Sequence, residues 1–293
     1  MRIAPFVSEA LSKNQPVVAL ESTVITHGLA RPENLAVARA MVEAVREAGA
    51  VPAVIAIVRG EVRVGLEEEE LKALAEDQAA EKASLWNLSA LVASRRTAGT
   101  TVAATAFLAH RAGIPVFATG GIGGVHPSPF DESADLVALA KTPILVVSSG
   151  MKSILDLAAT LERLETLGVA VLGYRTDRLP AFHSPTSPYS LPARVESPEE
   201  AAAVYRAQRG LGLSPAVLVF HPVSEGLPFE RVRAWVEEAN AEAQSRGIQG
   251  KALTPFLLRR LAEQSKGATD RVNRRLLVEN ARLAGEIARA LAR

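Results

Sequence analysis

Short apolar runs rich in β-branched residues alternate along the chain with longer segments of helical periodicity. Continuous apolar runs are typical of strands that are covered on both faces of a sheet. Six runs predict such strands: Val17–Leu20, Val54–Val58, Pro115–Ala118, Ile144–Val147, Val169–Leu172 and Ala216–Phe220. Because helical segments separate them, the order predicts an α/β fold, in which a mostly parallel sheet is flanked by helices on both faces. The segment Arg59–Gly65 predicts a small hairpin appended to this sheet.

The helical segments have recognisable ends. One is predicted from Pro32, a first-turn proline, to Gly49, a C-terminal stop. In another, Ser153–Leu167, apolar residues recur at helical spacing. The C-terminal third is predicted to be helical over three segments: Phe229–Ser245, Pro255–Gln264 and Thr269–Leu291. Since no linker interrupts the pattern, residues 1–293 are predicted to form a single domain.

One segment follows neither pattern. Tyr174–Pro198 has little periodicity, and prolines and serines are concentrated in its second half. A stretch of about 20 residues without regular structure inside a compact domain is usually functional. We therefore expect an ordered loop over a site or an interface.

Composition narrows the classes of function. Lys and Arg number 33 against 32 Asp and Glu, so no global positive field draws the protein to polymeric nucleic acid. There is no cysteine, which excludes disulfides, thiol nucleophiles and zinc–thiolate sites. The longest apolar run is far short of the roughly 20 residues that span a bilayer. We expect a soluble, cytoplasmic protein with no membrane partner.

Polar residues lie where predicted strands end, and open α/β sheets bind their ligands at this edge. Glu21 directly follows Val17–Leu20, and Lys152 follows the strand that ends at Val147. A lysine near a helix N-terminus, desolvated by apolar walls, can lose its proton at neutral pH and attack a carbonyl carbon. Taken singly, Glu21 is more simply a strand-end carboxylate, and Lys152 a solvated lysine in a first helical turn.

Three further segments have the composition of ion-binding sites. Gly120–Gly124, followed by His126, has the backbone freedom to place N–H groups around an anion, or to make a tight turn. Gly99–Val102 would open a helix with free N–H groups, which suits either a phosphate or plain capping. Asp131 and Asp135 could give oxygen ligands to a hard divalent ion, or cap a helix.

The combination of motifs resembles the pseudouridine-5′-phosphate glycosidase family. The block ALESTVITHG at 19–28 is similar to that family's N-terminal signature. The other blocks follow in chain order: GTTVAAT (99–105), FATGGIGGVH (117–126), SADL (133–136), GMKSILD (150–156), GYRT (173–176) and GKALTPFLL (250–258). The resemblance covers nearly the whole chain. It implies reversible cleavage of the C–C glycosidic bond of pseudouridine 5′-phosphate to uracil and ribose 5-phosphate.

The resemblance also implies roles for individual residues. Lys152 matches the lysine that forms a Schiff base with C1′ of the ring-opened ribose, and Glu21 matches the acid that donates the proton. Asp131 matches a manganese-binding aspartate, so Mn²⁺ or another divalent ion is the implied cofactor. The implied substrate contacts are Lys82, Val102, Ser133, Ala134, Asp135, the phosphate-side His126 and the uracil-side Asn273. The family resemblance further implies a homotrimer.

The implied reaction suits an amine nucleophile. A bond to C5 of uracil has no heteroatom leaving group, so the two-carboxylate mechanism of ordinary glycosidases cannot operate. Ring opening exposes an aldehyde-level carbon that Lys152 can capture as an iminium, and this electron sink permits cleavage once C5 is protonated. The amine must be neutral for this step, although the ordinary pKa of lysine is about 10.4.

The chain departs from the family pattern at three places. The loop Pro127–Phe130 is short and lacks an Arg-Gly start, Ser84–Leu88 replaces a charged run, and Glu279–Asn280 replaces Asn-Asn. We therefore expect altered affinity or specificity. Two alternatives stay open: a Schiff-base aldolase acting on sugar phosphates, and a non-catalytic nucleotide-binding module.

Overall fold

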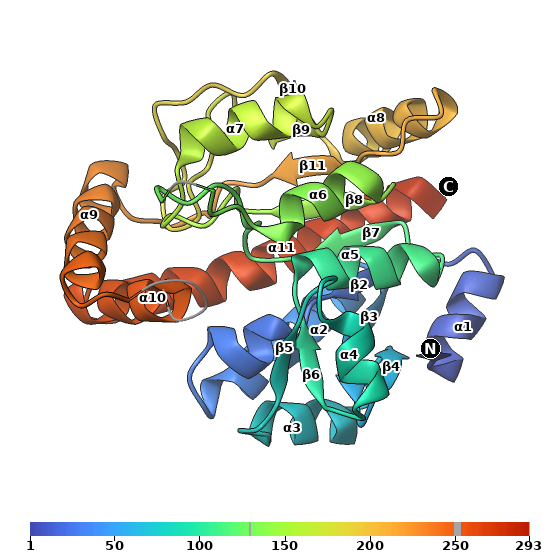
Figure 1. Cartoon of the computed structure of the whole chain (residues 1–293). Helices are drawn as coiled ribbons and strands as arrows, with labels where there is room; N and C mark the ends of the chain where they lie inside the picture. The colour runs from blue at the N-terminus through green and yellow to red at the C-terminus, as the bar shows by residue number, and fades with distance from the viewer. Residues whose placement is uncertain (129, 249–252, 293) are drawn as a thin grey trace.

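A single sheet runs through the computed structural model, which describes residues 1–128, 130–248 and 253–292 (Figure 1). Its strands are β1 (Arg2–Ile3), β2 (Val17–Leu20), β3 (Val51–Val58), β4 (Glu61–Val64), β5 (Glu81–Ala83), β6 (Ala98–Thr100), β7 (Val116–Ala118), β8 (Leu145–Ser148), β9 (Ala170–Tyr174), β10 (Ala193–Val195) and β11 (Val217–Phe220). The main path has the order β1-β4-β3-β2-β7-β8-β11-β9-β10, while β6 pairs with β3 and β5. Within the described residues, every strand pair is parallel except β3 with β4 and β3 with β6.

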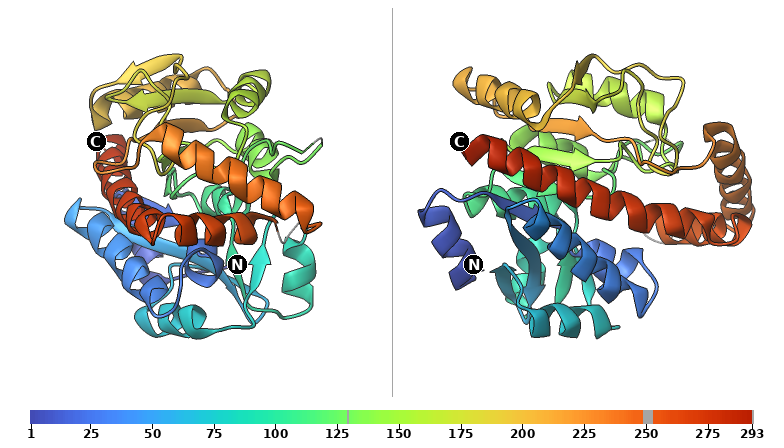
Figure 2. Two further views of the ribbon diagram at one scale, coloured as in Figure 1. Left: turned by 90° about the vertical axis from the view of Figure 1, so that its left-hand side faces the viewer. Right: turned by 180° about the vertical axis from the view of Figure 1, so that it is seen from behind.

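The helices cover both faces of this sheet. They are α1 (Pro5–Ser12), α2 (Glu33–Glu47), α3 (Glu68–Glu76), α4 (Leu88–Ala93), α5 (Val102–Arg111), α6 (Ala134–Lys141), α7 (Leu157–Thr166), α8 (Pro198–Gly210), α9 (Phe229–Ser245), α10 (Leu253–Gln264) and α11 (Ala268–Ala292), with one π-helical turn, η1 (Val24–Gly28). Figure 1 shows α5 and α6 on the face of the sheet that is turned toward the viewer. The rear view in Figure 2 shows α2 and α11 on the opposite face. The predicted fold class, including the helical C-terminal third, is confirmed.

Alternation along the strands builds two cores. In β8 and the residue before it, Ile144 and Val146 join the core that packs against α5, α6 and α7. Leu145 and Val147 join the other core, with residues of α2 and α11. All four side chains are fully buried. Burial on both faces explains why the strands have continuous apolar sequences rather than alternating ones.

The six predicted strands are confirmed as β2, β3, β7, β8, β9 and β11. The hairpin predicted at Arg59–Gly65 is confirmed only in part, because this range contains the single strand β4, whose antiparallel partner is the main strand β3. Two predicted helix starts are wrong. Pro32 precedes α2 as its N-cap residue instead of lying in the first turn. Helix α7 begins at Leu157 rather than at Ser153, because the Asp156 side chain accepts a hydrogen bond from Ala159 N (2.9 Å) and caps the helix.

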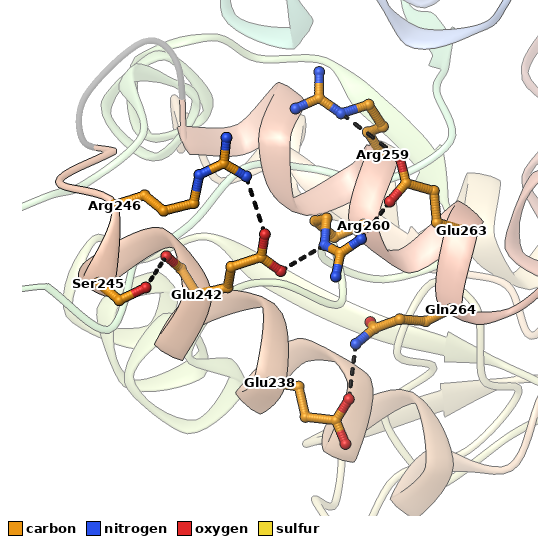
Figure 3. Close-up of polar contacts among 8 residues, drawn as sticks. All are labelled: Glu238, Glu242, Ser245, Arg246, Arg259, Arg260, Glu263 and Gln264. Atoms are coloured by element: carbon orange, nitrogen blue, oxygen red, sulfur yellow. Dashed lines mark hydrogen bonds and ion pairs between the residues drawn. The ribbon is translucent and has the colours of Figure 1, made fainter.

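Helices α9 and α10 form a pair beside the sheet, at the N-terminal end of α11 (Figures 1 and 2). Their charged faces are joined by a network of ion pairs, drawn in Figure 3. Glu242 of α9 bonds to Arg246 on its own helix (3.0 Å) and to Arg260 of α10 (2.7 Å). Gln264 of α10 donates to Glu238 of α9 (2.8 Å). None of the helices in the described ranges is both long and apolar enough to cross a membrane.

The segment Tyr174–Pro198 is ordered, as predicted, although it contains the unpredicted strand β10. Backbone bonds across the segment hold it, from Leu179 N to Tyr189 O and from Leu191 N to Asp177 O (both 2.9 Å). Its middle turn packs against the loop that bears Lys152, because Phe182 N donates to Ser149 O (2.8 Å).

Candidate active site

Glu21 is the buried acid of the site. It directly follows β2 and is only 9% exposed, and the Thr119 hydroxyl after β7 donates a hydrogen bond to its carboxylate. Burial raises the pKa of Glu21, while the charge of Lys152, the Thr119 hydrogen bond and the charge of Lys82 oppose this rise. The nearby Asp135 acts in the same direction as burial. Glu21 is therefore suited to hold a proton at a higher pH than an ordinary glutamate.

Lys152 lies at the end of an irregular segment that continues β8. This segment runs beside the glycine loop that follows β7, since Ile122 N donates to Gly150 O and Lys152 N donates to Ile122 O (both 3.1 Å). The lysine thus precedes Asp156, the N-cap of α7, and does not lie in the first turn of that helix. The side chains whose pKa values respond to the charge of Lys152 come from other segments of the chain.

Lys152 acts electrostatically on Glu21, Lys82 and His126, so these side chains face one common region. The pKa of Lys82 is lowered by burial of its amine and by the charge of Lys152, against the opposing charges of Asp135 and Glu21. Taken as a whole residue, Lys82 is nevertheless exposed. The site therefore combines two amines with an acid that burial favours in its neutral form.

Asp135 connects the predicted substrate-binding positions. It is 5% exposed, and its carboxylate accepts from Ala103 N (2.9 Å), the residue after Val102, and from Gly123 N (2.8 Å). Ser133 begins the same helix as its N-cap, accepting from Asp135 N (3.2 Å). The start of α5, the glycine loop and the start of α6 are thereby held together. Ala134, the first residue of α6, is exposed beside them.

His126 and Asp131 lie on the loop that leaves the glycine segment, of which Pro129 is outside the described residues. His126 N donates to Asp131 O (2.8 Å), and His126 Nδ1 is buried without a hydrogen-bond partner among the residues that the structure describes. The pKa of His126 is lowered by burial and by Lys152, and raised by Asp131. Among the residues that the structure describes, no three His, Cys, Asp or Glu side chains are grouped so as to hold a metal.

Asn273, the remaining predicted contact, is half-buried on α11, and in the described part of the chain no hydrogen bond joins it to the other site residues. The same helix reaches the site through a residue whose role was not predicted, Asn280, which is fully buried. Its amide donates to Thr119 O (2.9 Å) and Ser149 Oγ (3.1 Å), and its oxygen lies 3.2 Å from His221 Nδ1. Asn280 therefore ties together the ends of β7, β8 and β11.

Known proteins are similar to this chain along almost its whole length. The model of the indigoidine synthase A-like family matches residues 6–290. A pseudouridine-5′-phosphate glycosidase of Thermus thermophilus is 69% identical over 95% of this chain and 98% of its own length. The corresponding enzyme of Paracoccus denitrificans is 50% identical over 99% of this chain and 98% of its own. This chain belongs to the pseudouridine-5′-phosphate glycosidase family.

Two solved structures from the same fold agree. An indigoidine synthase A-like protein from Thermotoga maritima superposes with a TM-score of 0.90 at 41% identity, covering 96% of this chain and 94% of its own. A prealnumycin C-glycosynthase in complex with ribulose 5-phosphate superposes with a TM-score of 0.92 at 38% identity, covering 99% and 96%. Family membership agrees with the motif resemblance, whereas the roles of individual residues rest on the geometry above.

Proposed function

We propose that this protein is a pseudouridine-5′-phosphate glycosidase, which reversibly cleaves the bond between C1′ of the ribose and C5 of uracil. The observation that carries the proposal is the convergence of Lys152, Glu21 and Lys82 on one region at the carboxyl ends of β2 and β8. A relative of that name matches the chain at 69% identity over almost its full length. Its substrate is accordingly a small phosphorylated nucleotide.

In the proposed mechanism, the bond from C1′ to the ring oxygen opens, and the Lys152 amine bonds to C1′ in its place while the proton that the amine loses goes to that oxygen. Glu21, whose pKa is raised by burial, supplies the proton that C5 of the uracil takes up as the C–C bond breaks. The bonding electrons remain with the uracil carbon, and the nitrogen lone pair of Lys152 forms the double bond to C1′, so the iminium arises in this step. Hydrolysis then releases ribose 5-phosphate and restores the amine. Because the pKa of Lys82 is lowered, its amine is suited to receive protons during ring opening.

We also propose a divalent metal, Mn²⁺, held by Asp131. The described residues offer few protein ligands there, and His126 Nδ1 is a buried nitrogen without a partner beside this aspartate. A hard ion that keeps several waters and binds through one carboxylate and substrate phosphate oxygens fits so sparse a donor set. Bound there, it would neutralise phosphate charge. His126 and Asp131 would then orient the phosphate end of the substrate.

Uracil release tests the activity. Purified protein is mixed with pseudouridine 5′-phosphate and Mn²⁺, and uracil is followed by ultraviolet absorbance and chromatography. We expect multiple turnovers, and chelation followed by addition of Mn²⁺ alone should remove and restore them. A Schiff-base aldolase would leave pseudouridine 5′-phosphate intact but cleave a sugar phosphate. A binding module would be stabilised by the nucleotide against thermal unfolding but would form no product. Either of these results would refute the proposed function.

Assembly and location complete the proposal. We propose that the protein is cytoplasmic, which agrees with the absence of cysteine. We also propose that it forms a homotrimer, which is supported by apolar residues exposed on two neighbouring helices. Phe107 on α5 is 38% exposed and Val137 on α6 is 43% exposed, and these two helices pack against each other. Light scattering of the purified chain measures the assembly directly, and a monomeric mass would contradict the trimer.

A further inference from the structure

The turn Pro180–Ser184 pairs through its backbone with the segment that carries Lys152. Gly150 and Ala181 pair as an antiparallel bridge, and Phe182 N donates to Ser149 O (2.8 Å). Gly150 has a positive φ of 84°, and a Cβ atom there would collide with the carbonyl oxygen of Pro180. A side chain at position 150 is therefore excluded twice, by backbone conformation and by contact. The turn and the lysine segment fit each other closely on the main-chain level.

Phe182 of the same turn also packs against the glycine loop. It has a φ of 58°, a left-handed conformation that is rare for a bulky residue and that persists only where the surroundings determine it. The conformation directs the ring, which is 5% exposed, onto the loop, where Cβ atoms added to Gly120 or Gly121 would press against it. The same turn thereby contacts both segments whose mutual hydrogen bonds place Lys152.

The next residue adds a side-chain link immediately after the lysine. His183 is 2% exposed, and its Nδ1 lies 2.9 Å from Ser153 Oγ. Complete burial lowers the pKa of His183 to about 3, so at neutral pH its imidazole is uncharged and can accept the Ser153 hydroxyl proton in a hydrogen bond. The His183 carbonyl also accepts from Leu227 N (2.7 Å). The backbone of His183 is thus held by Leu227, while its side chain bonds to Ser153.

We propose that His183 is a positioning residue of this enzyme: through Ser153, it fixes the direction in which the Lys152 amine enters the site. The inference deepens the proposed function and rests on Lys152 as the nucleophile. Lys152 lies between Met151, whose side chain is fully buried, and Ser153. Among the described residues, the Ser153–His183 bond is therefore the side-chain hydrogen bond that lies nearest Lys152 on its C-terminal side in the sequence. An amine whose approach is wrong by about 1 Å can lose roughly 10²-fold in rate.

The rate of iminium formation tests this role without the full reaction. The complete chain is incubated with ribose 5-phosphate and cyanoborohydride, and the reduced adduct on the Lys152 peptide is followed by mass spectrometry. For Ser153→Ala and His183→Leu we expect the trapping rate at saturating sugar to fall about 10–10²-fold, with little change in the half-saturating concentration. The double variant should be no slower than the slower single variant, because both changes remove one interaction. His183→Asn, which restores a polar atom near Nδ1, should recover much of the rate.

A matched control removes a comparable hydrogen bond at the opposite end of the same strand. The Tyr205 hydroxyl donates to Pro143 O (3.0 Å), just before β8, so Tyr205→Phe should trap at the wild-type rate. Normal trapping by Ser153→Ala, or additive losses in the double variant, would overturn the inference even if melting temperatures fell. If His183→Leu does not fold, Ser153→Ala alone decides. Wild-type protein that is trapped but releases no uracil refutes only the proposed function, and wild-type protein that is never trapped refutes both.

Discussion

The site at the strand ends and the surface between α9 and α10 use charge in opposite ways. On α9 and α10, Glu242 keeps its charge: slight burial acts to raise its pKa, but bonds from Arg246 and Arg260 lower it (Figure 3). At the site, burial dominates, raising the pKa of Glu21 and lowering that of Lys82. Water-screened pairs contribute little to stability, whereas buried ionisable groups are costly. Stability alone therefore does not account for a buried acid beside two amines, whereas the proposed chemistry does.

The largest expected effect is the loss of the nucleophile. Lys152→Ala should reduce uracil release to the background rate, because the amine that bonds to C1′ is removed, while the melting temperature stays near that of the wild type. Lys141→Ala, which removes an exposed lysine at the end of α6, is the matched control and should be fully active. Substantial turnover by Lys152→Ala would show that the comparison places the chemistry on the wrong residue.

Removing the buried acid should come next. Glu21→Gln keeps the shape of the side chain and its contact with Thr119, but it cannot donate the proton, so kcat should fall by about 10²–10⁴-fold. Borohydride trapping of ribose 5-phosphate on Lys152 should persist, since that step needs the amine. Glu165→Gln on α7 removes an exposed carboxylate and should leave kcat unchanged. An undiminished rate in Glu21→Gln would mean that another group is the acid.

A subtler test concerns the pH dependence of the acid. The Thr119 hydrogen bond stabilises the charged form of Glu21 and so lowers its pKa. Removing it in Thr119→Val should raise that pKa further, so that the protonated acid survives to higher pH. The alkaline fall of kcat should then move to higher pH, whereas Thr119→Ser should keep the wild-type profile. A shift toward lower pH would contradict the assigned role of the hydroxyl.

The smallest effect is expected on α9. Glu242→Ala removes the partner of Arg246 and Arg260, yet both arginines can be solvated, so kcat should remain within about twofold of wild type. The melting temperature should fall slightly, and less at high salt because salt screens the pairs. Circular dichroism melting at two salt concentrations measures this. A loss of activity comparable to that of Glu21→Gln would remove the distinction between the two regions.

Much of the fold could be predicted because periodicity is a local signal. The apolar run Val17–Leu20 and the helix Phe229–Ser245 have the predicted ends. Strands β5 and β6 were not predicted, since three residues such as Glu81–Ala83 leave no periodic pattern. The start of α7 was misplaced because apolar spacing at Ile154 continues the helical period into the turn that precedes Asp156.

The same limit applies to the site: residues with a local signal could be predicted, and contacts between distant segments could not. Glu21 and Lys152 were predicted because each follows a recognisable strand and belongs to a family motif. Their partners were not, since the bond from Thr119 to Glu21 spans 98 residues and that from Ser153 to His183 spans 30. Such contacts depend on which strands become neighbours, and the sequence order of β2, β7 and β8 differs from a simple sequential sheet. The manganese, the trimer and the roles of the individual site residues, Lys152 and Glu21 included, remain predictions.

Asn280 has a consequence for how the protein is made. It follows Thr119 by 161 residues and Ser149 by 131, yet it bonds to both. A nascent chain can build most of the sheet as it emerges, but the ends of β7 and β8 are not joined through Asn280 until α11 has left the ribosome. Chains whose translation stops before α11 should therefore be inert, because the residue that holds these strand ends together is made long after them.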